Sequence, residues 1–421
     1  MRKRLLSRPA LIAVALALTA GGTALGATAH ASKAYVPAGE PAIPGVTYFR
    51  GTGAPYLPTK GAPNALSGDG VGQYGGAAQA RATKLGAAAG TKLGKKVKLK
   101  QLKIGYLDIV GGIQSADRAD NSMRNAAQHI GAKWLYCNGA GSPAQWVTCG
   151  NTLLAEGVNV IEETGIDPSS IASVVSAAKA KGVPIVNCCG LVGPGYAAAM
   201  YPNEAENGLI MAKYLKAKLG TLSGTSDIMA TEYPATWAKA RTQQLLTVIG
   251  NNPSALKIVN VAATDPTNLI AGTQSQVSSE LTADPSIRAI WADFDTAGQA
   301  VGQEVQKLDA GKRFPNKPLV VTFHADPSTQ TLMRSGAIDA VVDNNYDATA
   351  WEAQNAVAEH FARGTAFPAY TDAASYPGIG NPMEYEIVTG KDLPAVNHYV
   401  GPKYDVDSYF IAKWKAEGFG K

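Results

Sequence analysis

The chain has 421 residues, of which 46% are hydrophobic, 17% charged and 7% aromatic. This apolar content is enough for one large or two smaller hydrophobic cores, and it excludes a chain that is disordered throughout. The formal net charge is +5, but four basic residues lie within the first eight positions, so that +1 remains for the rest of the chain. A nearly neutral chain has no electrostatic reason to bind nucleic acid.

The amino terminus has the three parts of a secretory signal peptide. A basic start is followed by an apolar run over residues 10–20 and by small residues that end in Ala29-His30-Ala31, the pattern of a cleavage site. The apolar run is shorter than the ~20 residues that span a bilayer, which argues against a membrane anchor. We therefore expect cleavage after Ala31 and a mature protein that is secreted or otherwise extracytoplasmic, at the cell surface or in the periplasm.

Residues 32–100 are rich in Gly, Pro and Lys and show little periodicity. Between Asp69 and Asp108 there is no acidic residue, whereas eight lysine or arginine residues occur there. Two interpretations stay open: a solvated, mostly flexible spacer, or a tether to an anionic cell-wall or membrane surface. Residues 70–75 match the G-x-G-x-x-G pattern, but no strand precedes them, which argues against a dinucleotide site.

From about residue 101 onward, short apolar runs alternate with amphipathic segments. The apolar runs predict strands at 103–109, 134–136, 158–161, 184–186, 227–230, 256–261, 287–291 and 319–323. The amphipathic segments predict helices near 115–130, 143–156, 169–181, 204–219, 235–250, 268–283, 296–310, 327–335 and 348–363. The helix at 169–181 is preceded by Asp167-Pro-Ser-Ser170, in which Asp167 is expected to act as the helix cap.

This alternation predicts β-α-β units and therefore parallel sheets. Two consecutive sets of such units predict an α/β fold of two doubly wound parallel-sheet lobes. In open α/β sheets the ligand binds beyond the carboxyl ends of the strands, so we expect the site in the cleft between the lobes. The residues at these ends are Asp108, Cys137, Thr164, Cys188 and Cys189, followed by Thr231, Glu232, Tyr233, Phe294, Asp295, His324, Asp343, Asn344 and Asn345.

Residues 101–363 resemble the type I periplasmic binding proteins of sugar-type ABC transporters, in particular the ribose-binding-like branch. The resemblance depends on the order and spacing of several segments, namely residues 131–157, Asp167-Pro-Ser-Ser170 with 177–186, 297–300, 333–339 and 384–389. It implies two lobes joined by a hinge, a ligand cleft between them, and delivery of a small molecule to the transmembrane permease of an importer.

The resemblance also implies the domain boundaries. Residues 1–31 are the signal peptide and 32–100 the spacer. The first lobe comprises residues 101–203 plus 345–368, and the second lobe 204–344 plus 369–400. Residues 401–421 form a C-terminal tail with one amphipathic helix that docks on a lobe. The chain is expected to cross between the lobes near Pro202-Asn203, near Asn344–Tyr346 and after Pro368.

The expected ligand-binding residues lie at the family's ligand positions and at neighbouring strand ends. They are Ile113, Ser115, Thr164, Cys189, Gly190, Tyr233, Trp237, Lys239, Asn268, Phe294, His324 and Asn344. The family's sugar binders usually carry stacking Phe residues after the first strand, where this chain has Ile113, Ser115 and Ala116. An Asp-Arg pair of those sugar binders is replaced here by Cys189 and Gly190. Since each buried hydroxyl without a partner costs ~1–3 kcal/mol, a sugar in the usual geometry is disfavoured.

Two ligand classes fit these substitutions. One is a sugar or polyol that binds in an altered way. The other is a small, partly apolar compound with an acidic or strongly accepting group, for which Lys239 and His324 would supply the positive charge.

Four cysteines in a chain that is expected to be exported predict disulfide bonds. Cys137 ends a predicted strand and Cys149 lies on the following helix, so their Cα atoms can approach within the ~4.4–6.8 Å that a disulfide allows. For Cys188 and Cys189, a bond between neighbours and two free buried thiols both stay open. The sequence has no C-x-x-C or H-x-x-x-H spacing, so neither a metal nor another cofactor is expected.

Other function classes receive less support. The sequence has no G-x-S-x-G, H-E-x-x-H or Walker A segment, and we expect no enzyme activity, although Asp293 and Asp295 imitate a carboxylate pair. A transcription regulator would need a helix-turn-helix within residues 32–100, which show too little helical pattern. A sensor that presents its ligand to a membrane receptor stays open beside the importer component. We expect a monomer with a small-molecule ligand and a permease as partners, and no nucleic acid.

Overall fold

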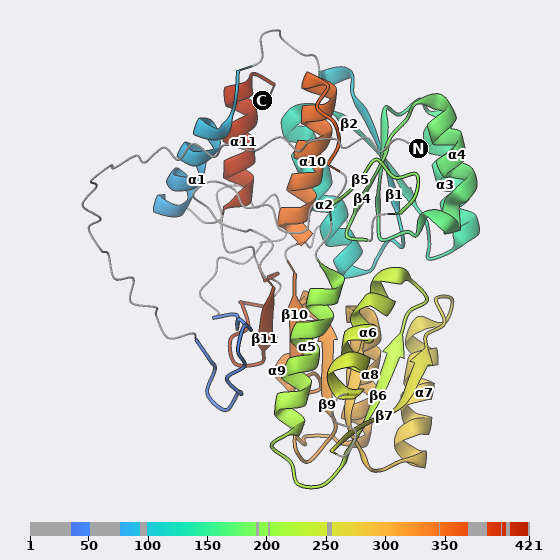
Figure 1. The fold of residues 1–421 in the computed structure, drawn as a ribbon, viewed down its shortest axis with the longest axis vertical. Helices are drawn as coiled ribbons and strands as arrows, with labels where there is room; N and C mark the ends of the chain where they lie inside the picture. The colour runs from blue at the N-terminus through green and yellow to red at the C-terminus, as the bar shows by residue number, and fades with distance from the viewer. Residues whose placement is uncertain are drawn as a thin grey trace, which may run out of the picture. The chain divides into compact units, whose positions relative to one another are not determined.

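The computed structural model describes residues 35–50, 76–92, 99–190, 193–200, 203–250, 255–344, 346–368, 385–396, 398–400 and 405–419. The signal-peptide prediction lies outside these residues. Figure 1 shows two α/β lobes within the unit that begins at Tyr35. Among the described helices, none has the length and apolar character that a bilayer span requires.

The first lobe contains a five-stranded, fully parallel sheet in the order β2-β1-β3-β4-β5. Its strands are β1 (Lys103–Asp108), β2 (Lys133–Asn138), β3 (Val160–Thr164), β4 (Ile185–Cys188) and β5 (Ala198–Met200). Its helices are η1 (Leu99–Gln101), α2 (Gln114–Ile130), α3 (Pro143–Ala155), η2 (Pro168–Ile171), α4 (Ala172–Lys181) and α10 (Tyr346–Arg363).

Alternate side chains of β1 serve the two faces of this sheet. Ile104 and Tyr106 pack in one core with α2 and α10, whereas Leu107 packs in the other core with α3 and α4. The alternation follows from the period of two along a strand. Both faces are therefore covered by helices, as in a doubly wound fold.

The second lobe contains a six-stranded sheet in the order β11-β10-β9-β8-β6-β7, in which only β11 runs antiparallel. Its strands are β6 (Ser226–Glu232), β7 (Leu256–Ala263), β8 (Ile287–Ala292), β9 (Leu319–Phe323), β10 (Ala340–Asp343) and β11 (Glu386–Thr389). Its helices are α5 (Glu204–Leu219), α6 (Thr236–Gly250), α7 (Leu269–Ala283), α8 (Asp295–Leu308) and α9 (Pro327–Ser335). The predicted fold of two parallel-sheet α/β lobes is confirmed.

Between β1 and β11 the chain passes between the lobes three times. β5 belongs to the first sheet and the following α5 packs on the second. β10 belongs to the second sheet, and the following α10 packs on the first. The third passage joins α10 to β11 through residues 369–384, which lie outside the described ranges, as do Pro202 and Asn345.

The expectation of a flexible spacer over residues 32–100 is wrong for two segments. Residues 35–50 lie along the second lobe, where Tyr48 forms a β-bridge with Ile387 and the Tyr214 hydroxyl donates to Glu40 at 2.9 Å. Residues 76–89 form a helix, α1 (Gly76–Ala89). The sequence pattern missed α1 because its small residues allow close packing without a broad apolar face.

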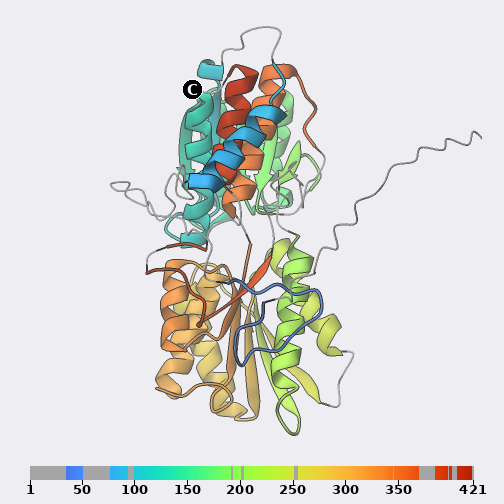
Figure 2. The same ribbon diagram turned by 90° about the vertical axis from the view of Figure 1, so that its left-hand side faces the viewer.

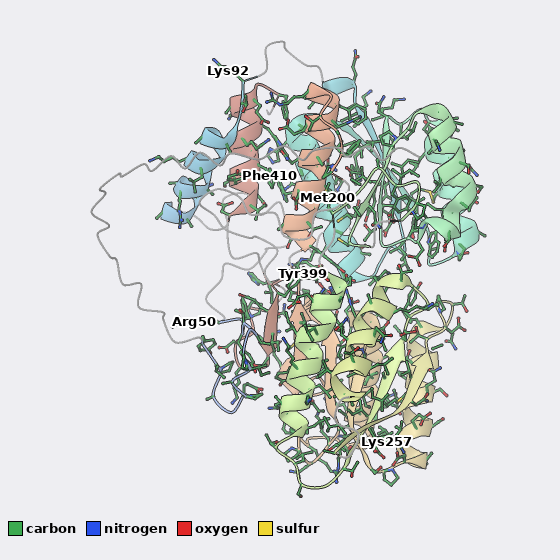
Figure 3. All side chains as sticks on the ribbon, viewed as in Figure 1. Arg50, Lys92, Met200, Lys257, Tyr399 and Phe410 are labelled. Atoms are coloured by element: carbon green, nitrogen blue, oxygen red, sulfur yellow. A yellow bond between two sulfur atoms is a disulfide. The ribbon has the colours of Figure 1, made fainter. Side chains whose placement is uncertain are left out.

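The C-terminal helix α11 (Val406–Glu417) holds α1 against the first lobe, and Figures 1 and 2 both show the two helices side by side. A Cβ atom on Gly86 of α1 would lie 2.0 Å from the backbone oxygen of Tyr409, so this contact requires glycine. Phe410 lies between α11 and α10 (Figure 3), and Trp414 stacks on Trp351 of α10 with 5.5 Å between ring centroids. The tail is therefore part of the core of the first lobe.

Candidate ligand-binding cleft

A cavity of about 90 Å³ lies at the carboxyl ends of the strands and is lined by both lobes. The first lobe contributes Ile109, Val110, Ile113, Ser115, Ala116, Gly141, Thr164, Gly165 and Cys189. The second lobe contributes Tyr233, Trp237, Pro266, Leu269, Phe294, Asp295 and His324, and Tyr346 begins α10. A cavity needs a volume of ~10–15 Å³ to hold one water molecule, so this cavity accommodates several waters or one small organic molecule.

A second cavity of about 210 Å³ adjoins the first and shares part of its lining. The shared residues are Ile109, Gly141, Gly165, Tyr233 and Pro266. Its own lining includes Asp167 of the first lobe and Pro234 of the second. The cleft therefore has an inner and an outer chamber.

Three aromatic side chains of the second lobe form one wall of the inner cavity. Tyr233 follows β6, Trp237 lies in the first turn of α6, and Phe294 immediately precedes α8. Tyr233 and Trp237 stack with 5.5 Å between their ring centroids, and Phe294 meets the two rings edge-on at 5.4 and 5.8 Å. Edge-to-face pairs are favourable, so the three rings hold one another in place and present a preformed apolar surface.

His324 forms part of the cavity floor and is engaged through both ring nitrogens. Nε2 lies 3.2 Å from Arg241 Nη1 and 3.2 Å from the Tyr346 hydroxyl, and Nδ1 lies 3.0 Å from Asn344 Oδ1. Because a guanidinium can only donate, Nε2 accepts, and Nδ1 carries the proton and donates to Asn344. Burial and the charges of Arg241 and Arg118 lower the pKa of His324 well below its ordinary value. His324 is therefore neutral, and the expectation that it supplies a cation to the ligand is wrong.

Arg241 supports this floor from behind. It is fully buried, pairs with Glu204, donates from Nη1 to the backbone oxygen of Asp293 at 2.7 Å, and does not line the cavity. Its guanidinium also lies 5.2 Å from the centroid of Trp237, which is one helical turn away on α6. Arg241 thus fixes both the aromatic wall and the histidine, while Glu204 balances its charge.

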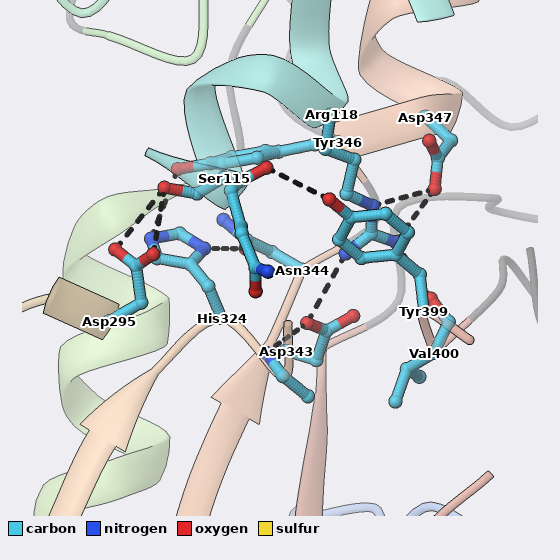
Figure 4. A network of polar contacts seen from close by, with 12 residues as sticks. Ser115, Arg118, Asp295, His324, Asp343, Asn344, Tyr346, Asp347, Tyr399 and Val400 are labelled. Carbon is cyan, nitrogen blue, oxygen red and sulfur yellow. Dashed lines mark hydrogen bonds and ion pairs between the residues drawn. The ribbon is translucent and has the colours of Figure 1, made fainter. Parts of the chain in front are cut away.

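Asp295, the first residue of α8, brings a carboxylate to the cavity. Both of its oxygens lie 3.2 Å from the Ser115 hydroxyl, which reaches across the cleft from α2 (Figure 4). The carboxyl group of Asp326 lies within hydrogen-bonding reach on the other side. Burial raises the pKa of both carboxyl groups, and the nearby charge of Asp295 raises that of Asp326 further.

Two backbone amides at helix starts in the second lobe donate to side chains of the first lobe. The Thr236 amide at the start of α6 donates to Asp167 Oδ2 at 3.2 Å, and the Thr236 hydroxyl donates to Asp167 Oδ1. The Ser328 amide in α9 donates to Gln114 Oε1 at 2.9 Å. The expectation that Asp167 caps the helix that follows it is wrong, because its side chain makes no cap bond to η2. It caps a helix of the opposite lobe instead.

The hinge side of the cleft is held by a buried ion network around Arg118 of α2. Its Nε donates to Asp347 at 2.8 Å, its Nη2 to the Val400 backbone oxygen at 2.7 Å, and its Nη1 lies 3.5 Å from Asp343 Oδ1 (Figure 4). Its guanidinium also lies 4.7 Å from the ring centroid of Tyr399, which lies where the lobes meet (Figure 3). The network joins α2, the end of β10 and the start of α10.

The cavity lining contains most, but not all, of the residues expected from the sequence. Those that line it are Ile113, Ser115, Thr164, Cys189, Tyr233, Trp237, Phe294 and His324. Four expected residues do not line it: Lys239 and Asn268 are exposed, Gly190 packs against Asn187, and Asn344 holds His324. With Lys239 outside and His324 neutral, neither predicted cation reaches the cavity.

Several residues that line the cavity are not among those expected from the sequence. Asp295 is expected at a strand end but not as a ligand-binding residue, and Tyr346 is expected only at a crossing between the lobes. Ile109, Val110, Gly141, Gly165 and Pro266 lie in loops, and Leu269 begins α7; the position of these residues depends on the packing of both lobes.

The cysteines form one disulfide bond. Cys137 and Cys149 are bonded, with 5.6 Å between their Cα atoms. Cys188 and Cys189 are free buried thiols with their sulfurs 2.8 Å apart, so the alternative of a bond between these neighbours is wrong for this structure. Burial raises the pKa of the Cys189 thiol, which therefore stays protonated.

The carboxylate pair of Asp293 and Asp295 does not face one ligand. Asp293 is buried, accepts from the Tyr233 amide at 2.6 Å and does not line the cavity. Within the described ranges, no three His, Cys, Asp or Glu side chains are grouped so that they could hold a metal ion.

A family model described as periplasmic binding protein domain matches residues 104–365. The fold is similar to that of an ABC transporter solute-binding protein from Burkholderia graminis C4D1M in complex with D-arabinose. The sequence identity is 18%, the TM-score is 0.61, and the match covers 71% of this chain and 98% of that chain. The fold is also similar to that of an ABC transporter solute-binding protein from Mycobacterium smegmatis with bound glycerol, with 18% identity, a TM-score of 0.59 and coverage of 69% and 94%.

A third similar structure is the 5-methylthioribose transporter solute-binding protein from Thermotoga lettingae TMO, in complex with 5-methylthioribose. The identity is 16%, the TM-score 0.60 and the coverage 70% of this chain and 89% of that chain. A search of curated proteins finds no match. Since the family model spans more than half of the chain, and the two parallel-sheet lobes have the expected architecture, this chain belongs to the type I periplasmic binding protein family.

Proposed function

We propose that this protein is an extracytoplasmic solute-binding protein that closes its two lobes around one small molecule and delivers it to the permease of an ABC importer. The observation that carries the proposal is the inner cavity, which takes its lining from both lobes and is bordered by hydrogen bonds that cross the cleft. The similar proteins bind D-arabinose, glycerol or 5-methylthioribose, which supports a small organic ligand. The signal-peptide pattern at residues 1–31 supports export.

The polar groups around the cavity favour a ligand with a substantial apolar part. Thr164 Oγ1 lies 2.5 Å from the Tyr106 hydroxyl, and His324 and Tyr346 hydrogen-bond to each other. Each of these contacts uses one hydrogen-bonding site of the group and leaves fewer for a ligand, and every sugar hydroxyl without a partner would weaken binding. The aromatic wall offers favourable contact to an apolar or planar body instead.

Native mass spectrometry of the purified mature protein tests this proposal, because a bound ligand would appear as a fixed mass difference. In a thermal-shift screen of metabolites, at least one compound should raise the melting temperature and be recovered unchanged. Turnover of the compound would contradict the proposal and indicate an enzyme. In cells that lack the gene, uptake of the compound should be lost; loss of a transcriptional response with normal uptake would indicate a sensor instead.

The site assignment is tested by Phe294→Ala. This variant removes the ring that meets both other rings of the wall, so the affinity for the identified compound should fall by more than tenfold. Leu308→Ala is the matched control, because Leu308 ends the same helix, α8, and is 48% exposed. Equal affinity of the Phe294→Ala variant and the control would contradict the assignment of this cavity.

A further inference from the structure

The charges around the inner cavity are unevenly distributed. Of the described residues that line it, Asp295 is the only one with a side chain that is ordinarily charged at neutral pH, and none is Lys or Arg. Two buried arginines behind the cavity form ion pairs with other carboxylates, Arg241 with Glu204 and Arg118 with Asp343 and Asp347. The charge of Arg241 also acts on Asp295, but Arg241 does not line the cavity. An acidic ligand would therefore meet a carboxylate and no available cation.

Asp295 is the member of the Asp295–Asp326 pair that carries the negative charge. Asp326 is fully buried, and neither of its carboxyl oxygens receives a hydrogen bond from any described donor. A carboxylate in such a place is strongly disfavoured, so Asp326 keeps a proton and donates it toward Asp295. Asp295 also accepts from Ser115, and these two donors stabilise its ionised form.

The aromatic wall begins at the residue before this carboxylate. Phe294 and Asp295 are adjacent in the chain and both line the cavity, with Tyr233 and Trp237 beside them. Aromatic faces attract organic cations, because the ring quadrupole places negative charge on the face. A carboxylate next to such rings is a combination that recognises an amine better than an alcohol or an acid.

We infer that the ligand is a small organic cation, such as a protonated amine on an apolar or sugar-like body. Its charge lies against Asp295 and its body against Tyr233, Trp237 and Phe294. This inference rests on the proposed function of the same cavity. A cationic ligand takes the place of the acidic ligand that the sequence suggested, because Lys239 does not line the cavity and His324 is neutral.

The test compares ligands with the same ring framework that carry a cationic, a neutral or an anionic group. Benzylamine, benzyl alcohol and benzoate form one series, and glucosamine, glucose and glucuronate form another; glycerol and D-arabinose represent neutral polyols and sugars. Binding is measured by isothermal titration calorimetry at pH 7. In at least one series, the amine should bind at least tenfold more tightly than its neutral counterpart, and the acid should bind most weakly. Asp295→Asn should abolish the preference for the amine. Asp309→Asn, at the far end of α8 and paired with Lys312, should retain it.

The outcomes separate this inference from the proposed function. If a neutral compound or an acid binds more tightly than every amine, the inference is wrong, while the solute-binding function stands. If no compound binds and no small molecule co-purifies, the proposed function fails and the inference fails with it. The ranking within each series on the unmodified protein decides the question even if the Asp295→Asn variant does not fold.

Discussion

The contact between Asp167 and Thr236 gives the sharpest prediction about lobe closure. Asp167 belongs to the first lobe, yet its carboxylate accepts from the amide and hydroxyl at the start of α6 in the second lobe. It makes no cap bond to its own helix. The side chain therefore stabilises the closed arrangement of the lobes without stabilising either lobe alone.

The magnitude follows from the capping interaction. Replacing an N-cap carboxylate by alanine costs about 1 kcal/mol, and the exposure of this contact argues against a larger value. Asp167→Ala should thus shift the balance between open and closed lobes about fivefold toward the open form. If the ligand-free protein is mainly open, the apparent affinity for the ligand falls by about the same factor.

Two measurements check this prediction. Titration calorimetry gives the affinity, and small-angle scattering with and without ligand gives the extent of closure. The matched control is Asp405→Ala, because Asp405 caps α11 within one lobe by accepting from the Ser408 amide at 3.0 Å. That control should lower the melting temperature and leave the affinity unchanged. Unchanged affinity in Asp167→Ala, or an equal loss in the control, would refute the role of the contact in closure.

Two further predictions concern stability. Burial, partly offset by a hydrogen bond from Gln354, raises the pKa of Glu162 from 4.5 to about 8. Because the folded state then holds this proton to higher pH than the unfolded chain does, Glu162 should lower the stability by about 1.4 kcal/mol for each pH unit between about 4.5 and 8. In urea unfolding, E162Q should lose less stability than the unmodified protein between pH 5 and pH 8, and equal losses would contradict the assignment. Replacing both Cys137 and Cys149 by Ser removes the disulfide bond across a sequence separation of 12 and should lower the free energy of unfolding by about 3 kcal/mol. A reducing agent should then lower the melting temperature of the unmodified protein but not that of the variant.

The sequence allowed prediction of the fold because the relevant signals are local. Alternating apolar runs and amphipathic segments define β-α-β units wherever they occur, and two sets of them define two sheets. The strand ends likewise identified Thr164, Tyr233, Phe294 and His324, since the carboxyl ends of parallel strands gather at one edge. The sequence did not predict helix α1, because its packing on α11 depends on small residues, which give no periodic apolar signal.

The roles of individual side chains were harder to predict, and α6 shows why. The sequence suggests Lys239 and His324 as the source of positive charge. Lys239 is exposed, however, whereas Arg241 is fully buried behind the cavity. Residues two apart on a helix point to different sides, whereas residues four apart share a face. Trp237 and Arg241 have that spacing of four, and this was the available signal for a cation packed on the aromatic wall.

The ligand class depends on which polar groups at the cavity are not already hydrogen-bonded to other residues of the protein. A strand-end residue can bind a ligand or support its neighbours, and its position does not decide between these roles. Asn344 and Arg241 each form a hydrogen bond with His324, and Thr164 forms one with Tyr106. Each of these contacts removes a polar group from the ligand's reach. Asp295 remains as the charged group at the cavity, and no Lys or Arg among the described residues lines the cavity beside it as a paired cation. A ligand that brings this cation would complete the electrostatic balance of the closed cleft, whereas a neutral sugar would leave the buried carboxylate uncompensated.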